Sequence, residues 1–333
     1  MSLQRFGIVG GGAWGTALAQ VLSRAGRSVT IWAREDDAVT AINRDHINPL
    51  FLPGVALDPG IVATGDLAGV AAVDALLLVA PAQHLRSIGT ALAPHIASGL
   101  PVVICTKGVE EQSGALMSEV VSAVLPQAVP AVLSGPTFAA EVARGLPTAI
   151  TLACRDAVLG QDLIATMGTR EFRPYFSDDV IGAEIGGAVK NVMAIACGVV
   201  LGRGMGDNAR AALITRGLAE MVRLALAKGG RPETLMGLSG LGDLTLTCSS
   251  TQSRNHSLGL ALGKGEKLAD FIAARRSVAE GVSSAAACAA LARQLKIEMP
   301  IVFAVDAILH RGAAIDQVVE ALLARPFKQE AGG

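Results

Sequence analysis

The chain has 333 residues, 51% hydrophobic and 17% charged, and its Lys plus Arg count (28) nearly balances its Asp plus Glu count (29). This much apolar material excludes a disordered chain, which needs low hydrophobicity and high net charge. The net charge of −1 lacks the basic excess of a nucleic-acid-binding surface, so we expect no nucleic-acid partner. At roughly 150 residues per domain, the length predicts about two domains.

Membrane insertion and cysteine chemistry are also disfavoured. No stretch reaches the roughly 20 uninterrupted apolar residues of a spanning helix; residues 189–201, for example, contain Lys190 and Asn191. A strand-like run begins at Phe6 and leaves no room for a signal peptide, so we expect a cytoplasmic protein without a membrane span. The cysteines stand apart without a CxxC pair, and we expect neither a disulfide framework nor a metal site.

The first half of the chain alternates short apolar runs with helical stretches such as 14–25 and 115–124. The runs that resemble strands cover residues 6–9, 28–32, 74–80, 101–106, 128–133 and 148–153. They are continuously apolar, which is typical of strands covered on both faces. The alternation therefore predicts an N-terminal α/β domain with a doubly wound, Rossmann-like parallel sheet.

The pattern changes near Asp178, after which there is almost no strand signal. Helices separated by glycine-rich breaks are predicted over residues 180–201, 208–228, 253–262, 283–294, 300–310 and 316–323. We therefore expect a dinucleotide-binding domain over residues 1–185 and an all-α C-terminal domain, with substrate and catalytic residues, over residues 186–333. No linker separates the two parts, so a small-molecule ligand is expected in the cleft between them.

A glycine-rich loop follows the first predicted strand. Gly10, Gly12 and Gly15 form a GxGxxG pattern, with Trp14 inside it, between that strand and the first helix. The glycines allow a tight turn and close approach of the backbone to a pyrophosphate at the helix N-terminus. The motif alone is a weak signal, but its strand–loop–helix context predicts a dinucleotide site. A glycine-rich turn without a ligand is the alternative.

The end of the second predicted strand bears on coenzyme choice, because Arg34 comes first there and Glu35 follows. An acidic residue at this place accepts from the ribose 2′-OH of NAD, whereas an arginine accommodates the 2′-phosphate of NADP. Arg34 therefore predicts that NADPH binds at least as well as NADH. Alternatively, Arg34 stacks on the adenine, or the charged run is a solvated turn.

Several polar residues follow strands or lie in unusual surroundings. Lys107 comes directly after one apolar run, and Gly135 and Thr137 follow another, at the sheet edge where α/β proteins bind ligands. Lys190 lies in a helix that is apolar on every side, and burial lowers the pKa of a lysine towards catalytic usefulness. The alternatives are a solvated loop lysine for Lys107 and a lysine that snorkels to the surface for Lys190.

Three further polar clusters precede predicted helices. Asp243 lies in a glycine-rich turn, Ser253-Arg254-Asn255 opens a helix, and Glu280 lies in a later turn. An anion at the second cluster would meet both a helix N-terminus and a guanidinium group. Helix capping is the alternative role for Asp243, Ser253 and Glu280.

These motifs occur in an order that resembles a known family. Behind the GGGAWG loop come Lys107, Lys190-Asn191, Asp243 and Ser253-Arg254-Asn255, and the chain is similar over essentially its whole length to the bacterial NAD(P)-dependent sn-glycerol-3-phosphate dehydrogenases. The resemblance implies reversible reduction of dihydroxyacetone phosphate to sn-glycerol 3-phosphate, which supplies glycerophospholipid synthesis. It implies NADPH or NADH as coenzyme without a metal, and a possible homodimer formed through the helical half.

The resemblance also implies residue roles, with Lys190 as the general acid/base. The residues implied to contact substrate are Lys107, Gly135, Thr137, Lys190, Asp243, Ser253, Arg254 and Asn255. The residues implied to contact coenzyme, together with the glycines of the loop (Gly10, Gly12, Gly15), are Trp14, Arg34, Lys107, Ala139, Arg254, Val278 and Glu280.

Two departures from the family pattern and two competing functions stay open. Ala13 replaces the serine often found in the glycine loop, and the acidic Glu35 beside Arg34 weakens the case for 2′-phosphate binding. A 3-hydroxyacid or 6-phosphogluconate-type dehydrogenase shares the two-part plan and the Lys-Asn pair, but the Arg254-Asn255 helix start argues against it. A non-catalytic NAD(P)H sensor has no need for Lys190 in an apolar helix.

Overall fold

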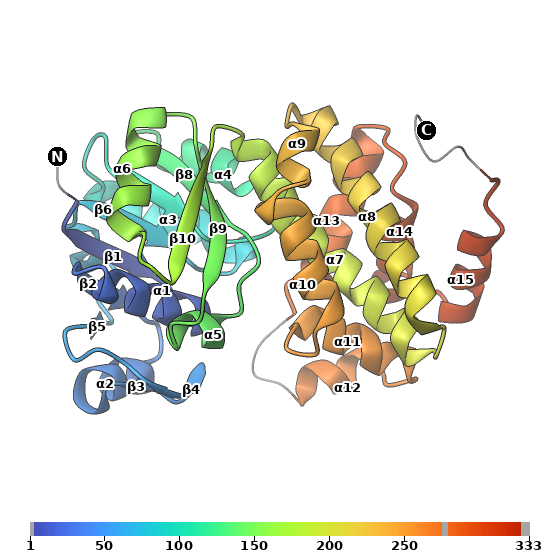
Figure 1. Ribbon diagram of the computed structural model, residues 1–333, viewed down its shortest axis with the longest axis horizontal. Coiled ribbons are helices and arrows are strands. Elements are labelled where there is room, and N and C mark those ends of the chain that lie inside the picture. The colour runs from blue at the N-terminus through green and yellow to red at the C-terminus, as the bar shows by residue number, and fades with distance from the viewer. Residues whose placement is uncertain (1–2, 275–278, 328–333) are drawn as a thin grey trace.

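The computed structural model describes residues 3–274 and 279–327. An α/β half built from the N-terminal part of the chain lies beside a helical half built from the C-terminal part (Figure 1). The predicted fold class, a Rossmann-like domain followed by a helical domain, is confirmed.

The main sheet has eight strands in the order β10-β9-β8-β7-β6-β1-β2-β5. Neighbouring strands pair in parallel except β8 and β9, which are antiparallel. The strands are β1 (Arg5–Val9), β2 (Ser28–Trp32), β5 (Val62–Thr64), β6 (Ala75–Leu78), β7 (Pro101–Ile104), β8 (Val129–Ser134), β9 (Thr148–Cys154) and β10 (Phe172–Ser177).

Helices cover both faces of this sheet, as its continuously apolar strands predict. Along β1, Phe6 and Ile8 pack in one core with residues of α1 and α6, whereas Val9 packs in a second core with residues of α3 and α4. The helices of this half are α1 (Ala13–Arg24), α2 (Asp36–Asp45), α3 (Leu85–Leu92), α4 (Met117–Val124), α5 (Ala139–Ala143) and α6 (Ala157–Met167), with 3₁₀ turns η1 (Gly69–Ala71), η2 (Ala82–His84) and η3 (Ala93–His95).

Four strands, β3 (Ile47–Asn48), β4 (Leu52–Ala56), β5 and β10, were not predicted from the sequence. β3 and β4 form a separate antiparallel pair, and β5 and β10 lie at the two edges of the main sheet. Pro174 lies inside β10, where it obscures the strand pattern. An edge strand tolerates proline because one side of the strand makes no ladder hydrogen bonds.

The helical half is organised around α7 (Val180–Gly202), which contacts α8, α10, α11, α13 and α14. Its crossing with α11 is close enough to require glycine: a Cβ on Gly198 would lie 2.1 Å from the His256 carbonyl oxygen, and one on Gly259 2.0 Å from that of Ile195. The other elements are α8 (Gly206–Lys228), α9 (Pro232–Leu235), the π-helical turn η4 (Leu238–Gly242), α10 (Asp243–Ser249), α11 (Arg254–Gly263), α12 (Leu268–Ala273), α13 (Gly281–Gln294), α14 (Pro300–His310) and α15 (Ile315–Leu323).

Helix α7 also joins the two halves. Val180 and Ala183 pack in the core beneath the sheet, whereas Ile185 and the residues after it pack in the helical core. Within the described part of the chain, α7 is the one helix whose length and composition would allow it to cross a membrane, yet 83% of its most apolar stretch is buried. That burial is typical of the central helix of a globular fold.

Candidate active site

The glycine loop between β1 and α1 has the backbone of a dinucleotide site. Gly10 adopts φ of 128°, and a Cβ on Gly15 would lie 1.9 Å from the Gly10 carbonyl oxygen, so both positions require glycine. A Cβ on Gly12 would meet nothing within 4 Å, and no side chain caps α1 there. The open N-terminus of α1 and the buried, unpartnered Nε1 of Trp14 therefore fit a polar ligand such as a pyrophosphate.

Arg34 follows β2, as the sequence predicts. Its Nη2 lies 2.8 Å from Glu35 Oε1, its Nε lies 3.2 Å from the same oxygen, and its side chain is 78% exposed. Glu35 therefore competes for the guanidinium that would meet a 2′-phosphate. An exposed pair of this kind is weak, so an incoming phosphate can displace it.

The centre of the site is a carboxylate shared by two lysines. Asp243 is fully buried, and its two oxygens lie 2.7 Å from Lys107 Nζ and 2.7 Å from Lys190 Nζ. Lys107 also donates to the Gly135 carbonyl oxygen at 3.0 Å, and Thr137 Oγ1 donates to the same oxygen at 3.3 Å. The loops after β7 and β8 thus meet α7 and α10 at one point.

Glycines allow this meeting. Asp243 begins α10 directly after the π-helical turn, and a Cβ on Gly186 of α7 would lie 2.1 Å from the Ser239 carbonyl oxygen in that turn. A Cβ on Gly187 would lie 2.8 Å from Ser134 Oγ and 3.2 Å from Lys107 Cγ. The two glycines of α7 thus admit the turn that presents Asp243 and the side chain of Lys107.

Lys190 has an environment suited to proton transfer. Burial and the positive charge of Lys107 together lower its pKa to about 8, against the attraction of Asp243. Lys190 Nζ also lies 3.0 Å from Thr247 Oγ1, one turn after Asp243 on α10. A lysine with a pKa near neutrality can both give and take a proton at physiological pH.

A series of hydrogen bonds joins the three helices α7, α11 and α13. Asn255 Nδ2 donates to Asn191 Oδ1 at 2.9 Å, and Asn255 Oδ1 accepts from Gly281 N at 2.9 Å. Ser253 caps α11, because its hydroxyl oxygen accepts from His256 N at 3.2 Å. The capping role weighed for Ser253 is therefore present in the structure.

Two charged side chains border the same region. Arg254 is exposed in the first turn of α11, and Glu280 is half-buried just before α13. Burial raises the pKa of Glu280, and the positive charges of Arg254, Lys190 and Lys107 oppose that rise. Glu280 therefore lies within electrostatic reach of all three cations.

The remaining predicted positions are less central. Ala139 begins α5, which packs against α1, and Val278 lies outside the described residues. Thr247 and Asn191 were not among the predicted site residues, although both contact residues that were. The spacing of four residues between Asp243 and Thr247 on one helix could have indicated the threonine.

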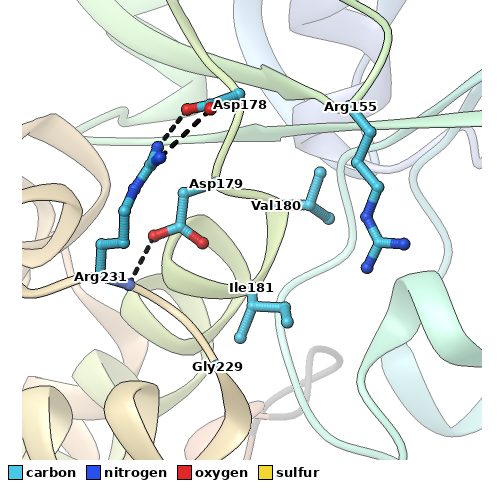
Figure 2. A pocket seen from close by; sticks show the side chains of 7 residues that line it. All are labelled: Arg155, Asp178, Asp179, Val180, Ile181, Gly229 and Arg231. Carbon is cyan, nitrogen blue, oxygen red and sulfur yellow. Dashed lines mark hydrogen bonds and ion pairs between the residues drawn. The ribbon is translucent and has the colours of Figure 1, made fainter.

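A pocket of about 180 Å³ lies elsewhere, at the N-terminus of α7, and neither Lys107 nor Lys190 lines it. Figure 2 shows Arg231 paired with Asp178 on one side of it and Arg155 on the other. Asp179 caps α7 by accepting from Gly182 N at 2.8 Å, and its other oxygen accepts from Arg231 N at 2.8 Å. These bonds hold the start of α7 against Arg231, the residue before α9.

The cysteines and possible metal ligands give no additional site. All five cysteines are buried as free thiols. Over residues 3–274 and 279–327, no three His, Cys, Asp or Glu side chains gather as they would around a metal ion.

Comparison with known proteins identifies the family. The protein-family model described as "NAD-dependent glycerol-3-phosphate dehydrogenase N-terminus" matches residues 5–159. The family model for the C-terminus of the same enzymes matches residues 179–320. A glycerol-3-phosphate dehydrogenase [NAD(P)+] of Parvibaculum lavamentivorans is 59% identical over 99% of both chains. One from Caulobacter vibrioides is 58% identical over 99% of this chain and 100% of its own.

Solved structures agree. The crystal structure of glycerol-3-phosphate dehydrogenase from Coxiella burnetii superposes with a TM-score of 0.94 at 42% identity, covering 98% of this chain and 100% of that one. The 3-hydroxyacid, 6-phosphogluconate and sensor alternatives are not favoured by these comparisons. The chain therefore belongs to the family of NAD-dependent glycerol-3-phosphate dehydrogenases, which are oxidoreductases that use NAD(P).

Proposed function

We propose that this chain catalyses the reversible, NAD(P)H-dependent reduction of dihydroxyacetone phosphate to sn-glycerol 3-phosphate. The observation that carries the proposal is the buried cluster in which Asp243 holds Lys107 and Lys190 at 2.7 Å each. The family to which the chain belongs supports the choice of substrate.

The residues of the cluster divide the chemistry. A bound reduced nicotinamide supplies the hydride that reduces the substrate carbonyl carbon. Lys190 Nζ donates a proton to the carbonyl oxygen in reduction and takes it back in oxidation, as its pKa of about 8 allows. Lys107 stabilises the negative charge that develops on that oxygen, and Asp243 and Thr247 hold the Lys190 ammonium in place.

The substrate phosphate is assigned to the start of α11. Arg254 offers an exposed guanidinium there, and the helix N-terminus favours an anion. Ser253 and Asn255 flank it in the chain, while Gly135 and Thr137 lie beside Lys107. Separate recognition of the phosphate and the carbonyl would orient the substrate for reaction.

The coenzyme is assigned to the glycine loop and its neighbours. Gly10, Gly12, Trp14 and Gly15 would hold the pyrophosphate and Arg34 the adenosine end. Ala139, Lys107, Arg254, Val278 and Glu280 are assigned as further coenzyme contacts by resemblance to the family.

We also propose the division into residues 1–185 and 186–333, a cytoplasmic location, a role in glycerophospholipid synthesis and a homodimer formed through the helical half. The change of core between Ala183 and Ile185 supports the domain division. The other three proposals rest on the family.

The function is tested by adding dihydroxyacetone phosphate together with NADPH or NADH and monitoring the oxidation of the coenzyme by its absorbance. We expect turnover, and its rates with the two coenzymes give the preference. Lys190→Met should lower kcat on the order of 10²- to 10⁴-fold while NADPH still binds, because it removes the acid and keeps the apolar stem. The exposed Lys264→Met is the matched control. Tight NADPH binding without turnover in the wild-type chain would refute the proposal.

A further inference from the structure

A buried carboxylate outside the reaction cluster joins α4 to α7, the helix that connects the two halves of the molecule. Glu184 of α7 is 4% exposed, and its oxygens accept from the backbone N of Ser118 at 2.7 Å and from Ser118 Oγ at 2.5 Å. Ser118 lies in the first turn of α4, in the α/β half. Burial raises the pKa of Glu184 to about 7, and the bonds from Ser118 oppose that rise. A buried carboxylate without such partners would be strongly disfavoured.

The segment that ends at α4 begins with Lys107. Its residues Val109 and Leu116 pair in an isolated antiparallel bridge, and both are buried in the core of the helical half. It also contacts the α/β half, where Gln83 Nε2 donates to the Val109 carbonyl oxygen at 2.9 Å. The segment thus bridges the halves, with Lys107 at one end and the α4 turn at the other.

Helix α7 carries both Glu184 and Lys190, and a continuous helix keeps their relative positions nearly constant. The bonds to Ser118 therefore tie the end of the Lys107 segment to the helix that presents Lys190. We propose that Glu184 is a positioning residue, which through Ser118 fixes Lys107 relative to Lys190 so that both reach Asp243. This inference rests on the proposed function.

A neighbouring ion pair is a weaker second tie. Lys228 at the end of α8 lies 2.7 Å from Glu119 Oε1, and the Glu119 side chain is 47% exposed. Exposed ion pairs contribute little because solvent screens them. Glu184 itself is buried, so its loss should be the larger perturbation.

A double-mutant cycle tests the assignment. Glu184→Ala should lower kcat/KM for dihydroxyacetone phosphate on the order of 10- to 100-fold, the cost of displacing a reacting group by about 1 Å. In a Lys107→Ala background the same substitution should have little further effect, because the residue that it positions is gone. An equal factor in both backgrounds, or no effect in either, would overturn the proposal.

The chain offers a matched control in Glu220. It is 1% exposed and accepts from the backbone N of Ile301 at 2.7 Å and of Val302 at 3.2 Å, so it binds two backbone donors as a buried acid of the helical half. Glu220→Ala should lower stability without lowering kcat/KM of the folded enzyme. If it lowers kcat/KM as much as Glu184→Ala does, the effect is general destabilisation and the proposal fails.

Two milder variants guard against loss of folding. Glu184→Gln keeps an acceptor for the Ser118 N–H and can donate to Ser118 Oγ, so it should restore kcat/KM towards the wild-type value. Ser118→Ala should show a smaller loss than Glu184→Ala, again dependent on Lys107. Loss in Glu184→Gln equal to that in Glu184→Ala would contradict a positioning role through these bonds.

Hydrogen–deuterium exchange separates this inference from the proposed function. Glu184→Ala should accelerate amide exchange over residues 108–118 and leave α11 unchanged. If wild-type chain does not turn over dihydroxyacetone phosphate, the proposed function fails, and the exchange result still reports on the tie. Unchanged exchange over residues 108–118 would overturn the positioning role by itself.

Discussion

Replacing Asp243 with asparagine should change the pH dependence of catalysis as well as its rate. In the proposed mechanism, reduction requires protonated Lys190, whose pKa is about 8, so kcat/KM for dihydroxyacetone phosphate in the wild-type chain should fall about tenfold per pH unit above that value. Oxidation requires the neutral amine, so kcat/KM for sn-glycerol 3-phosphate should rise with pH and level off above about 8. Asp243→Asn should move the pH at which each of these two kcat/KM profiles changes slope (its break) to a lower value.

The direction and size follow from the contacts. Burial and the charge of Lys107 lower the pKa of Lys190, whereas Asp243 raises it, so removing the carboxylate leaves only the weaker attraction of Glu280 to oppose the lowering influences. Two opposite unit charges about 4 Å apart attract by roughly 4 kcal/mol at an effective dielectric constant of about 20. One pKa unit corresponds to about 1.4 kcal/mol, so even half of that attraction moves the pKa down by more than one unit.

The assay is the pH profile of kcat/KM for reduction, measured in wild type and Asp243→Asn. At pH 8 the variant should lose more than tenfold in kcat/KM, from loss of the protonated acid together with poorer placement of both lysines. Asp306→Asn is the matched control, because Asp306 is also buried and also accepts from two cationic side chains, Arg293 at 2.9 Å and Arg311 at 3.1 Å. It should lower stability and leave the pH profile in place.

A slower Asp243→Asn enzyme whose pH profile still bends near pH 8 would contradict the assigned charge interaction. Asp243 would then affect only the placement of groups, and Lys190 would not be the residue that titrates. A break that moved to higher pH would contradict the charge argument directly.

Three further predictions follow from single contacts. Gly187→Ala should lower kcat, because its Cβ would lie 2.8 Å from Ser134 Oγ and 3.2 Å from Lys107 Cγ and would displace Lys107; an unaltered kcat would contradict the need for glycine at this position. Arg34→Ala should raise the Kd of NADPH more than that of NADH in fluorescence titrations, and equal increases would contradict 2′-phosphate recognition. Burial raises the pKa of Glu220 from 4.5 to about 7, so the folded chain holds a proton that the unfolded chain has lost, and the free energy of unfolding should fall by up to roughly 3 kcal/mol as pH rises through this window. Urea titrations of Glu220→Gln should show a smaller fall, and an identical slope would contradict the assignment.

Short-range patterns were sufficient for the parts of the fold that depend on neighbouring residues. Apolar runs marked the central strands, glycine spacing marked the loop before α1, and the boundaries of α14 agree with prediction at both ends. The edge strand β10 was missed because Pro174 interrupts a pattern that only its edge position makes acceptable. The antiparallel step from β8 to β9 likewise has no local signature.

The chemistry of the site required the tertiary structure. Lys190 was recognisable as a charge in an apolar helix, but its partner Asp243 lies 53 residues away in the chain, and Lys107 lies 136 residues from the same carboxylate. Contacts over such separations depend on how α7 and α10 pack against the sheet, and no spacing rule reports them. The pKa of Lys190 and the tie between Glu184 and Ser118 therefore follow from folding, because burial and opposing charges act through space and not along the chain.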